Sequence, residues 1–130
     1  MHKNYLAVAA IFGGLAVALG AFGAHRLEQV TMDEKIIQGF RTGVQYQMYH
    51  AIVLLFIALA FDKLPADKAK LAANCFITGI ILFSGSLYLL TFLKIQESTS
   101  VRFAGPITPV GGLFFIVGWL LLLLAAVKRK

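Results

Sequence analysis

Long charge-free runs alternate with short charged segments along this chain. The runs cover residues 4–24, 42–61, 71–93 and 103–127, and within the last we expect the membrane span at 107–127. Each run exceeds the roughly 18 residues that indicate a transmembrane helix, because about 20 residues at ~1.5 Å each cross a bilayer core. The pattern therefore predicts an all-α protein, an integral membrane four-helix bundle that forms one transmembrane domain over residues 1–130.

Composition agrees with this prediction. Hydrophobic residues make up 59% of the chain and charged residues only 14%, whereas a soluble domain carries about 25% charged residues. A cleaved signal peptide is the alternative for the first run, but that run is longer than the ~7–15 residues of a signal core. The single cysteine, Cys75, excludes an intramolecular disulfide, and we expect it to be a small packing residue.

The segment between the first two spans predicts a short helix of its own. Thr31 and Glu34 stand in the capping-box relation, which indicates a helix start near Met32. Apolar residues then recur at helical spacing between charged ones as far as Val44. We expect a short amphipathic interfacial helix between spans 1 and 2. A solvated charged turn is the alternative.

The net charge of +6 bears on orientation. Four spans leave both termini on one side of the membrane, and the Lys and Arg residues divide seven to five in favour of that side. By the positive-inside rule we expect an inner-membrane protein with both termini in the cytoplasm. The charge then serves topology and contact with anionic membrane lipid, and nucleic acid is not an expected partner. The seven are Lys3, Lys63, Lys68, Lys70, Lys128, Arg129 and Lys130, and the five are Arg26, Lys35, Arg41, Lys94 and Arg102.

A polar cluster marks the first half of the second span. Gln45, Tyr46, Gln47, Tyr49 and His50 precede the apolar residues 51–61. Polar side chains are costly in a bilayer and are retained mostly where they have a function. Since His50 lies ~12 Å along the helix from Thr42, we expect a neutral imidazole that is hydrogen-bonded to the third or fourth span. The candidate partners are Ser84, Ser86, Tyr88 and Thr108.

Connectivity brings four unusual stretches to the same outer leaflet, namely residues 20–25, 46–50, 83–90 and 105–112. We expect this region to bind a ligand or a partner. Two simpler explanations stay open, since tyrosines form interfacial belts and polar side chains join membrane helices. The candidate binding residues are His25, Gln45, Tyr46, Gln47, Tyr49, His50, Ser84, Ser86, Tyr88, Thr108 and Pro109.

Small residues predict where the helices approach closely. The first span carries Ala9, Gly13, Ala16, Gly20 and Gly23 at spacings of three and four, which lie on one helix face. Such faces let membrane helices pack tightly. The expected helix-packing glycines are Gly13, Gly20, Gly23, Gly85, Gly111 and Gly112.

Several kinds of chemistry are not favoured. All six carboxylates lie outside the predicted spans, whereas a proton-coupled carrier normally needs one inside the membrane. The three histidines and Cys75 are spread over different depths, so no metal site is expected. A nucleophilic triad would lack a buried acid. We therefore expect no catalytic residue and no cofactor, and the sequence favours a non-enzymatic protein without deciding the question.

Four motifs together resemble one family. Their order and spacing are similar to those of the small four-span bacterial membrane proteins grouped as domain of unknown function 423, the YgdD type. Arg26, where many members have glycine, and the longer third loop around residues 96–100 depart from that pattern. The resemblance implies a multi-pass inner-membrane protein and carries no biochemical activity. The motifs are Gly20-Ala21-Phe22-Gly23-Ala24-His25, Tyr46-Gln47-Met48-Tyr49-His50, Phe83-Ser84-Gly85-Ser86-Leu87-Tyr88 and Ile107-Thr108-Pro109-Val110-Gly111-Gly112.

Two functional hypotheses follow from these observations. The first is a non-enzymatic accessory or scaffold protein that binds lipid, an unidentified membrane protein or a second copy of itself. The alternative is a small oligomeric channel or carrier for a neutral or weakly charged solute. A quinone, haem or lipid site is a third and weaker hypothesis. The expected pore-lining residues of the channel are Gln47, His50, Ser84, Ser86 and Thr108.

Overall fold

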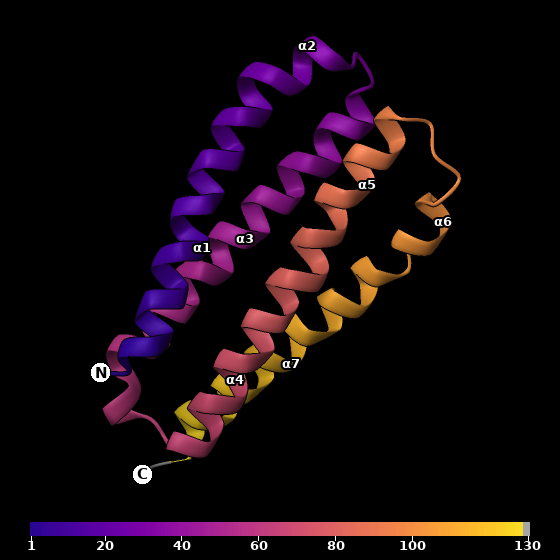
Figure 1. Ribbon diagram of the computed structural model, residues 1–130. Coiled ribbons are helices and arrows are strands. Elements are labelled where there is room, and N and C mark those ends of the chain that lie inside the picture. The colour runs from indigo at the N-terminus through magenta and orange to yellow at the C-terminus, as the bar shows by residue number, and fades with distance from the viewer. Residues whose placement is uncertain (129–130) are drawn as a thin grey trace.

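The computed structural model describes residues 1–128, which form helices and turns without a β-strand among them. Four helical segments, Lys3–Val30, Glu34–Lys63, Ala66–Ile95 and Val101–Val127, are long and apolar enough to cross a membrane. Each contains a predicted span and extends beyond it. The segments alternate in direction, so the start of the first and the end of the fourth lie at the same end of the bundle (Figure 1). Arg129 and Lys130, which entered the charge count, lie outside the described residues.

The four segments are built from α-helices joined by short turns. The helices are α1 (Lys3–Phe22), α2 (Glu28–Val30), α3 (Glu34–Ala60), α4 (Ala66–Gly79), α5 (Gly85–Ile95), α6 (Val101–Ala104) and α7 (Ile107–Val127). One π-helical turn, Gly23–Leu27, joins α1 to α2, and another, Ile80–Ser84, joins α4 to α5. A 3₁₀ turn, Phe61–Lys63, extends α3.

Local sequence explains several helix starts. The side chain of Asp33 caps α3 by accepting a hydrogen bond from the backbone N–H of Lys35 at 3.0 Å. Pro65 and Pro106 stand immediately before α4 and α7, where a missing N–H is tolerated. Leu64 has extended backbone angles, as the residue before a proline favours. The chain therefore reverses sharply between the second and third spans.

The all-α bundle is confirmed, but the expected interfacial helix is not a separate element. Residues 34–41 form the first turns of α3 and continue without a break into the second span. Ile37 and Phe40 from these turns pack against Leu27, so their apolar face covers protein. The capping prediction is also wrong in detail, since Thr31 accepts a hydrogen bond from Asp33 N–H and Asp33 itself caps the helix.

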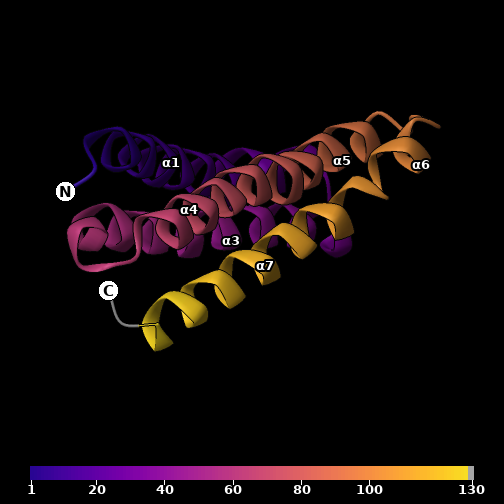
Figure 2. The ribbon, with the colours of Figure 1, turned by 90° about the horizontal axis from the view of Figure 1, so that it is seen from below.

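The helices pack as two pairs, and α3 connects the pairs through its contacts with the third span. α1 packs along α3, while α7 packs along α4 and the π-helical turn that follows it. α3 also contacts α5, and Figure 2 shows α4 between α1 and α7. Small side chains allow close approach in the larger core cluster. That cluster contains Ala9, Leu54, Ile57, Ala69, Ala72, Ala73, Phe76, Ile80 and Phe115.

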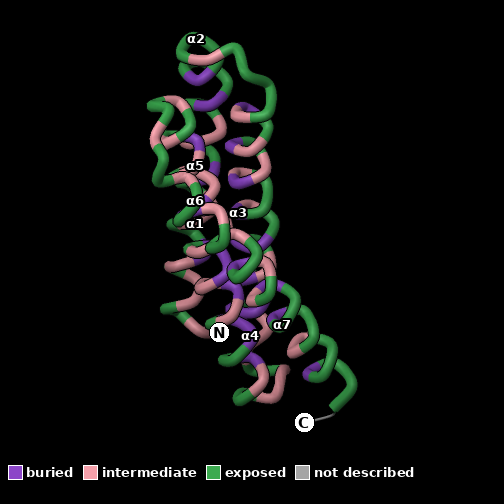
Figure 3. Tube along the Cα trace, turned by 90° about the vertical axis from the view of Figure 1, so that its right-hand side faces the viewer, coloured by how far each residue is buried: buried purple, intermediate pink, exposed green. Residues whose placement is uncertain are grey.

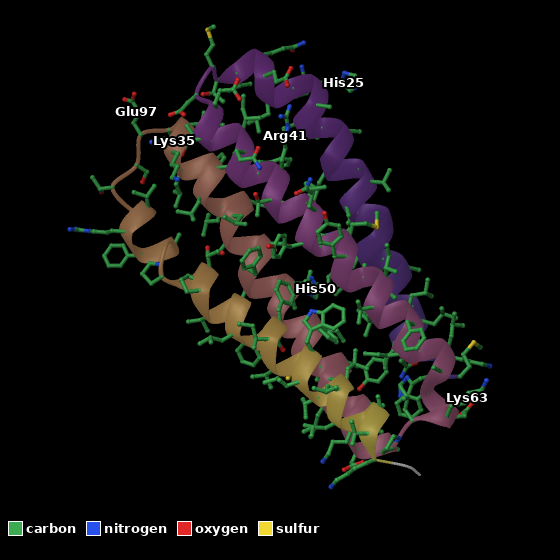
Figure 4. All side chains as sticks on the ribbon, turned by 180° about the vertical axis from the view of Figure 1, so that it is seen from behind. His25, Lys35, Arg41, His50, Lys63 and Glu97 are labelled. Carbon is green, nitrogen blue, oxygen red and sulfur yellow. The ribbon has the colours of Figure 1, made fainter. Side chains whose placement is uncertain are left out.

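The outer faces of the helices are apolar and exposed. Buried positions follow the inside of the bundle, and most of α7 is exposed or half-buried (Figure 3). This distribution suits a protein whose outer side chains contact lipid. Figure 4 shows the labelled charged residues towards the ends of the bundle and His50 near its mid-length.

Candidate functional site

Gln47 connects three helices through a buried amide. Its side chain is 3% exposed. Its Nε2 donates to the backbone carbonyl of Phe12 on α1 at 2.8 Å. Its Oε1 accepts a hydrogen bond from the hydroxyl of Tyr88 on α5 at 2.7 Å. The amide thus satisfies one donor and one acceptor in a buried position, which favours a fixed arrangement of the first three spans.

Ser84 makes a second buried connection at the end of the π-helical turn. Its hydroxyl donates to the carbonyl of Gly43 on α3 at 2.7 Å. Gly43 allows this approach because a Cβ there would stand 2.9 Å from the ring of Tyr88. The π-helical turn and the missing side chain together let α3 and α5 approach closely.

Ser86 and Thr108 join the third and fourth spans. Their hydroxyls are hydrogen-bonded to each other, and Ser86 also donates to the carbonyl of Phe83 at 2.9 Å. Close to this contact, Gly111 packs against the backbone of Phe83, where an added Cβ would stand 2.3 Å from the amide nitrogen. α7 is therefore held tightly against the third span at this level.

His50 makes its hydrogen bonds with α7 and with its own helix, and its ring also lies near Phe76 on α4. Its Nδ1 lies 2.7 Å from the carbonyl of Tyr46, and its Nε2 lies 3.2 Å from the indole nitrogen of Trp119. Because a carbonyl only accepts and an indole N–H only donates, these contacts fit the neutral tautomer with its proton on Nδ1. The imidazole also stacks on Phe115, with ring centroids 3.7 Å apart and planes at 6°.

The expected hydrogen-bond partners of His50 are wrong. Ser84, Ser86, Tyr88 and Thr108 bond to other groups, and Trp119 takes their place. His50 lies ~2 Å from the middle of the charge-free run 42–61, and Trp119 lies ~3 Å from the middle of α7. This contact therefore lies near the middle of both spans.

A lateral groove lies between α3 and α7 beside this contact. Among the described residues, the backbones of the two helices are close together at very few positions. Aromatic side chains lie in the space between them. The groove has a volume of about 540 Å³. Tyr46 and Tyr49 are 38% and 53% exposed, and neither hydroxyl has a hydrogen-bond partner within residues 1–128. The lining residues are Tyr46, Tyr49, His50, Phe83, Gly112, Phe115, Ile116 and Trp119.

Of the eleven predicted binding residues, Tyr46, Tyr49 and His50 line this groove and the other eight do not. Five of those eight make the helix-joining hydrogen bonds described above, and the remaining three lie elsewhere on the surface. His25 is exposed in the π-helical turn at the end of the first span, near the end of the bundle (Figure 4). Gln45 is exposed beside a separate shallow pocket between the first two spans. Pro109 is exposed on α7. The structure therefore does not bring them together with Tyr46, Tyr49 and His50.

The predicted packing glycines have different surroundings. A Cβ on Gly23 would stand 2.7 Å from the ring of Phe40, and one on Gly20 would be in ordinary contact with Val44 at 3.4 Å. Gly112 has only the ring of Phe83 nearby, at 3.8 Å. Gly13 and Gly85 have no atom of the described residues within 4 Å of a Cβ position. Close packing thus gives no reason for glycine at these two positions.

Phe83, Phe115 and Trp119 are groove residues that the sequence interpretation missed. One face of α7 carries residues at positions i, i+3, i+4 and i+7, namely Gly112, Phe115, Ile116 and Trp119. The signal was hidden because α7 is apolar on every side, and periodicity cannot then distinguish a packed face from a lipid-facing one. Gly79 on α4, which faces the ring of Phe115, was also missed as a close-packing position.

The chemistry available at the groove is binding by ring contacts and hydrogen bonds. Within residues 1–128, no three His, Cys, Asp or Glu side chains lie together as metal ligands would. Every buried side-chain nitrogen and oxygen in this part of the chain has a hydrogen-bond partner. The free hydrogen-bonding capacity is therefore at the partly exposed rim formed by the two tyrosines.

Comparison with known proteins finds relatives over nearly the whole chain. A family model described as "Protein of unknown function (DUF423)" matches residues 19–112, which contain all four motifs. The UPF0382 membrane protein YwdK of Bacillus subtilis is 45% identical over 127 residues, which cover 97% of this chain and 98% of that protein. This chain belongs to the DUF423 family.

Other relatives of this DUF423 protein also carry membrane-protein names. A UPF0382 membrane protein of Haemophilus influenzae is 40% identical over 131 residues, covering 100% of this chain and 98% of that protein. The UPF0382 inner membrane protein YgdD of Escherichia coli is 38% identical over 125 residues, covering 96% and 90%. No solved structure matches this chain. The family predicted from the motifs is confirmed, and the protein is a multi-pass membrane protein.

Proposed function

We propose that this DUF423 protein is a non-enzymatic binding protein of the bacterial inner membrane, whose lateral groove holds a lipid-soluble molecule. The groove between α3 and α7 carries this proposal. Its volume of about 540 Å³ falls within the roughly 300–1,000 Å³ of small-molecule sites. It also combines apolar ring surfaces with a few polar atoms, as such sites do.

The contrast between the groove and the rest of the polar cluster supports binding over simple helix association. Gln47, Ser84 and Ser86 are buried, and their hydrogen bonds join helices within the chain. The hydroxyls of Tyr46 and Tyr49 lie at the partly exposed rim of the groove. Neither makes a hydrogen bond to another helix among the described residues. In hydrocarbon an unpaired hydroxyl is unfavourable, so a bound molecule with acceptors would stabilise this arrangement.

The channel alternative has less support. Its expected lining residues Gln47, Ser84 and Ser86 are at most 5% exposed and are bonded within one copy of the chain. Side chains that line a pore between copies would instead have to face outwards. The apolar outer surface accounts for contact with lipid without a protein partner. An accessory role of the protein would depend on the molecule that the groove binds.

Orientation is a further part of the proposal. Arg26, Lys35, Arg41, Lys94 and Arg102 lie on the segments at one end of the bundle, and the start of α1 and the end of α7 lie at the other. The seven-to-five distribution of Lys and Arg favours cytoplasmic termini. The rim formed by Tyr46 would then face the outer half of the membrane.

Native mass spectrometry of protein taken from its own membranes in a mild detergent tests the binding proposal. We expect the chain to carry a non-covalent adduct with a discrete mass. Gly112→Leu should remove the adduct, because Gly112 lines the groove and has no atom closer than 3.8 Å to a Cβ position. Gly14→Leu is the matched control, because Gly14 is exposed on α1 with no atom within 4 Å. Equal adducts on the two variants would contradict the proposal.

A further inference from the structure

The groove presents polar groups that can donate hydrogen bonds, and these groups bear on the ligand that the proposed function requires. Tyr46 and Tyr49 each bring a hydroxyl without a partner in residues 1–128. Trp119 brings an indole N–H, whose 3.2 Å contact with His50 is at the long end of the usual range of about 2.7–3.2 Å. Because the indole N–H only donates and each hydroxyl can donate, a ligand with oxygen acceptors can bond to all three groups.

Depth restricts where those acceptors can come from. Tyr49 and Trp119 lie within ~4 Å of the middle of their spans, and Tyr46 lies ~8 Å from it. A bilayer core is ~30 Å thick, so the ester carbonyls and headgroups of phospholipids stay ~15 Å from the middle. An acceptor that reaches Tyr49 or Trp119 therefore belongs to a molecule that resides inside the hydrocarbon.

Ring packing further narrows the class of ligand. The walls are aromatic: Tyr46 stacks on Phe83 with centroids 4.8 Å apart, and His50 stacks on Phe115 at 3.7 Å. Inside a membrane an acyl chain gains no hydrophobic free energy by leaving other lipid tails. A flat ring instead gains stacking contacts with these walls, and Gly112 leaves room beside Phe83 for it.

We infer that the groove binds the ring of a lipid-soluble quinone, with a ring carbonyl accepting a hydrogen bond from the hydroxyl of Tyr46 or Tyr49 and the apolar tail lying between α3 and α7. This inference rests on the proposed binding function and makes it specific. It involves binding alone, without electron transfer. The other ring carbonyl could replace His50 as the acceptor of the hydrogen bond from the Trp119 indole N–H. This exchange would loosen the contact between the second and fourth spans.

Trp119 is the single tryptophan of the chain, so its fluorescence reports directly on the groove. The experiment is a titration of the protein in phosphatidylcholine nanodiscs with decylubiquinone, a quinone with a saturated tail. Decylbenzene, which has the same tail on a six-membered ring without oxygen substituents, serves as the competitor. We expect saturable quenching by decylubiquinone that decylbenzene does not reverse.

Two sets of variants separate site binding from quenching by quinone dissolved in the lipid. Gly112→Leu should turn the saturable curve into a weak linear one, while Gly14→Leu should match the unsubstituted protein. The double variant Tyr46→Phe, Tyr49→Phe keeps both rings and should weaken the apparent affinity about tenfold, which corresponds to the loss of about one good hydrogen bond. Far-ultraviolet circular dichroism checks that each variant is folded.

Two results would overturn the inference. Linear quenching of equal strength in the unsubstituted protein and Gly112→Leu would place the quinone in bulk lipid. Unchanged affinity in the tyrosine double variant would remove the carbonyl assignment. Nanodiscs with acyl-chain-brominated phosphatidylcholine distinguish this failure from failure of the proposed function. Bromine quenching that Gly112→Leu abolishes, without a saturable quinone curve, would mean that an acyl chain occupies the groove.

Discussion

Trp119 donates its indole N–H to Nε2 of His50 at 3.2 Å, and this hydrogen bond joins the fourth span to the second near the middle of the membrane. We expect His50→Phe to retain a ring against Phe115 but to remove the acceptor. The unpaired indole should then emit at shorter wavelength, and the free energy of unfolding should fall by about 1 kcal/mol. Tyr49→Phe is the control and should leave the emission wavelength unchanged. An unshifted spectrum in His50→Phe would contradict the hydrogen bond.

Replacement of Gln47 tests the buried amide that connects α1, α3 and α5. Gln47→Leu removes the partners of the Phe12 carbonyl and the Tyr88 hydroxyl. We expect a loss of about 1–3 kcal/mol in unfolding free energy, because both groups remain in an apolar environment. Denaturation in mixed detergent micelles measures it. Gln45→Leu, two positions earlier and exposed, should cost less than about 0.5 kcal/mol, and equal losses would contradict this role of Gln47.

Adjacent glycines on α7 provide a matched test of helix packing. Gly111→Ala would bring a Cβ to 2.3 Å from the amide nitrogen of Phe83, and backbone cannot move aside as a flexible side chain can. We expect a loss of about 1–3 kcal/mol from overpacking. Gly112→Ala has its nearest neighbour at 3.8 Å and should be nearly neutral. Thermal unfolding of both variants measures the difference, and a stable Gly111→Ala would contradict the contact with Phe83.

Fusion reporters test the proposed orientation. A fluorescent protein fused after the C-terminus should fold and fluoresce, because we place that end in the cytoplasm. Alkaline phosphatase, which is active only outside the cytoplasm, should be active when fused within the loop at Gln96. The opposite pair of results would show the reverse orientation, with the C-terminal fusion outside the cytoplasm. The bundle itself would be unaffected, since the start of α1 and the end of α7 lie at the same end in either orientation.

The four spans could be predicted from sequence because hydrocarbon tolerates few charges, and so the charge-free runs mark them directly. The buried roles of Gln47 and Ser84 were also accessible, since an uncharged polar residue within such a run needs a partner. Their particular partners were not. Ser84 bonds to the carbonyl of Gly43 at the end of a π-helical turn, and regular helical spacing does not predict such a turn.

The hydrogen-bond partner of His50 could not be predicted from the sequence, and the reason is different. Trp119 lies on α7, where residues 107–127 offer no polar side to contrast with an apolar one. Which face packs depends on how α7 crosses the third span, and that is fixed by contacts such as Gly111 with Phe83 and Gly118 with Phe76. Glycine spacing alone did not separate these positions from Gly13 or Gly85, which have no close neighbour among residues 1–128.

Photocrosslinking in intact membranes tests most directly whether the groove selects a ligand. A benzophenone amino acid at position 116 would stand in the groove, and one at position 15 would stand on the lipid-facing side of α1. Ile116 and Leu15 are similarly exposed, at 57% and 50%. After irradiation, mass spectrometry of the purified chain should find one discrete small-molecule adduct at position 116 and a mixture of phospholipid adducts at position 15. The same phospholipid mixture at both positions would contradict a ligand-selective groove.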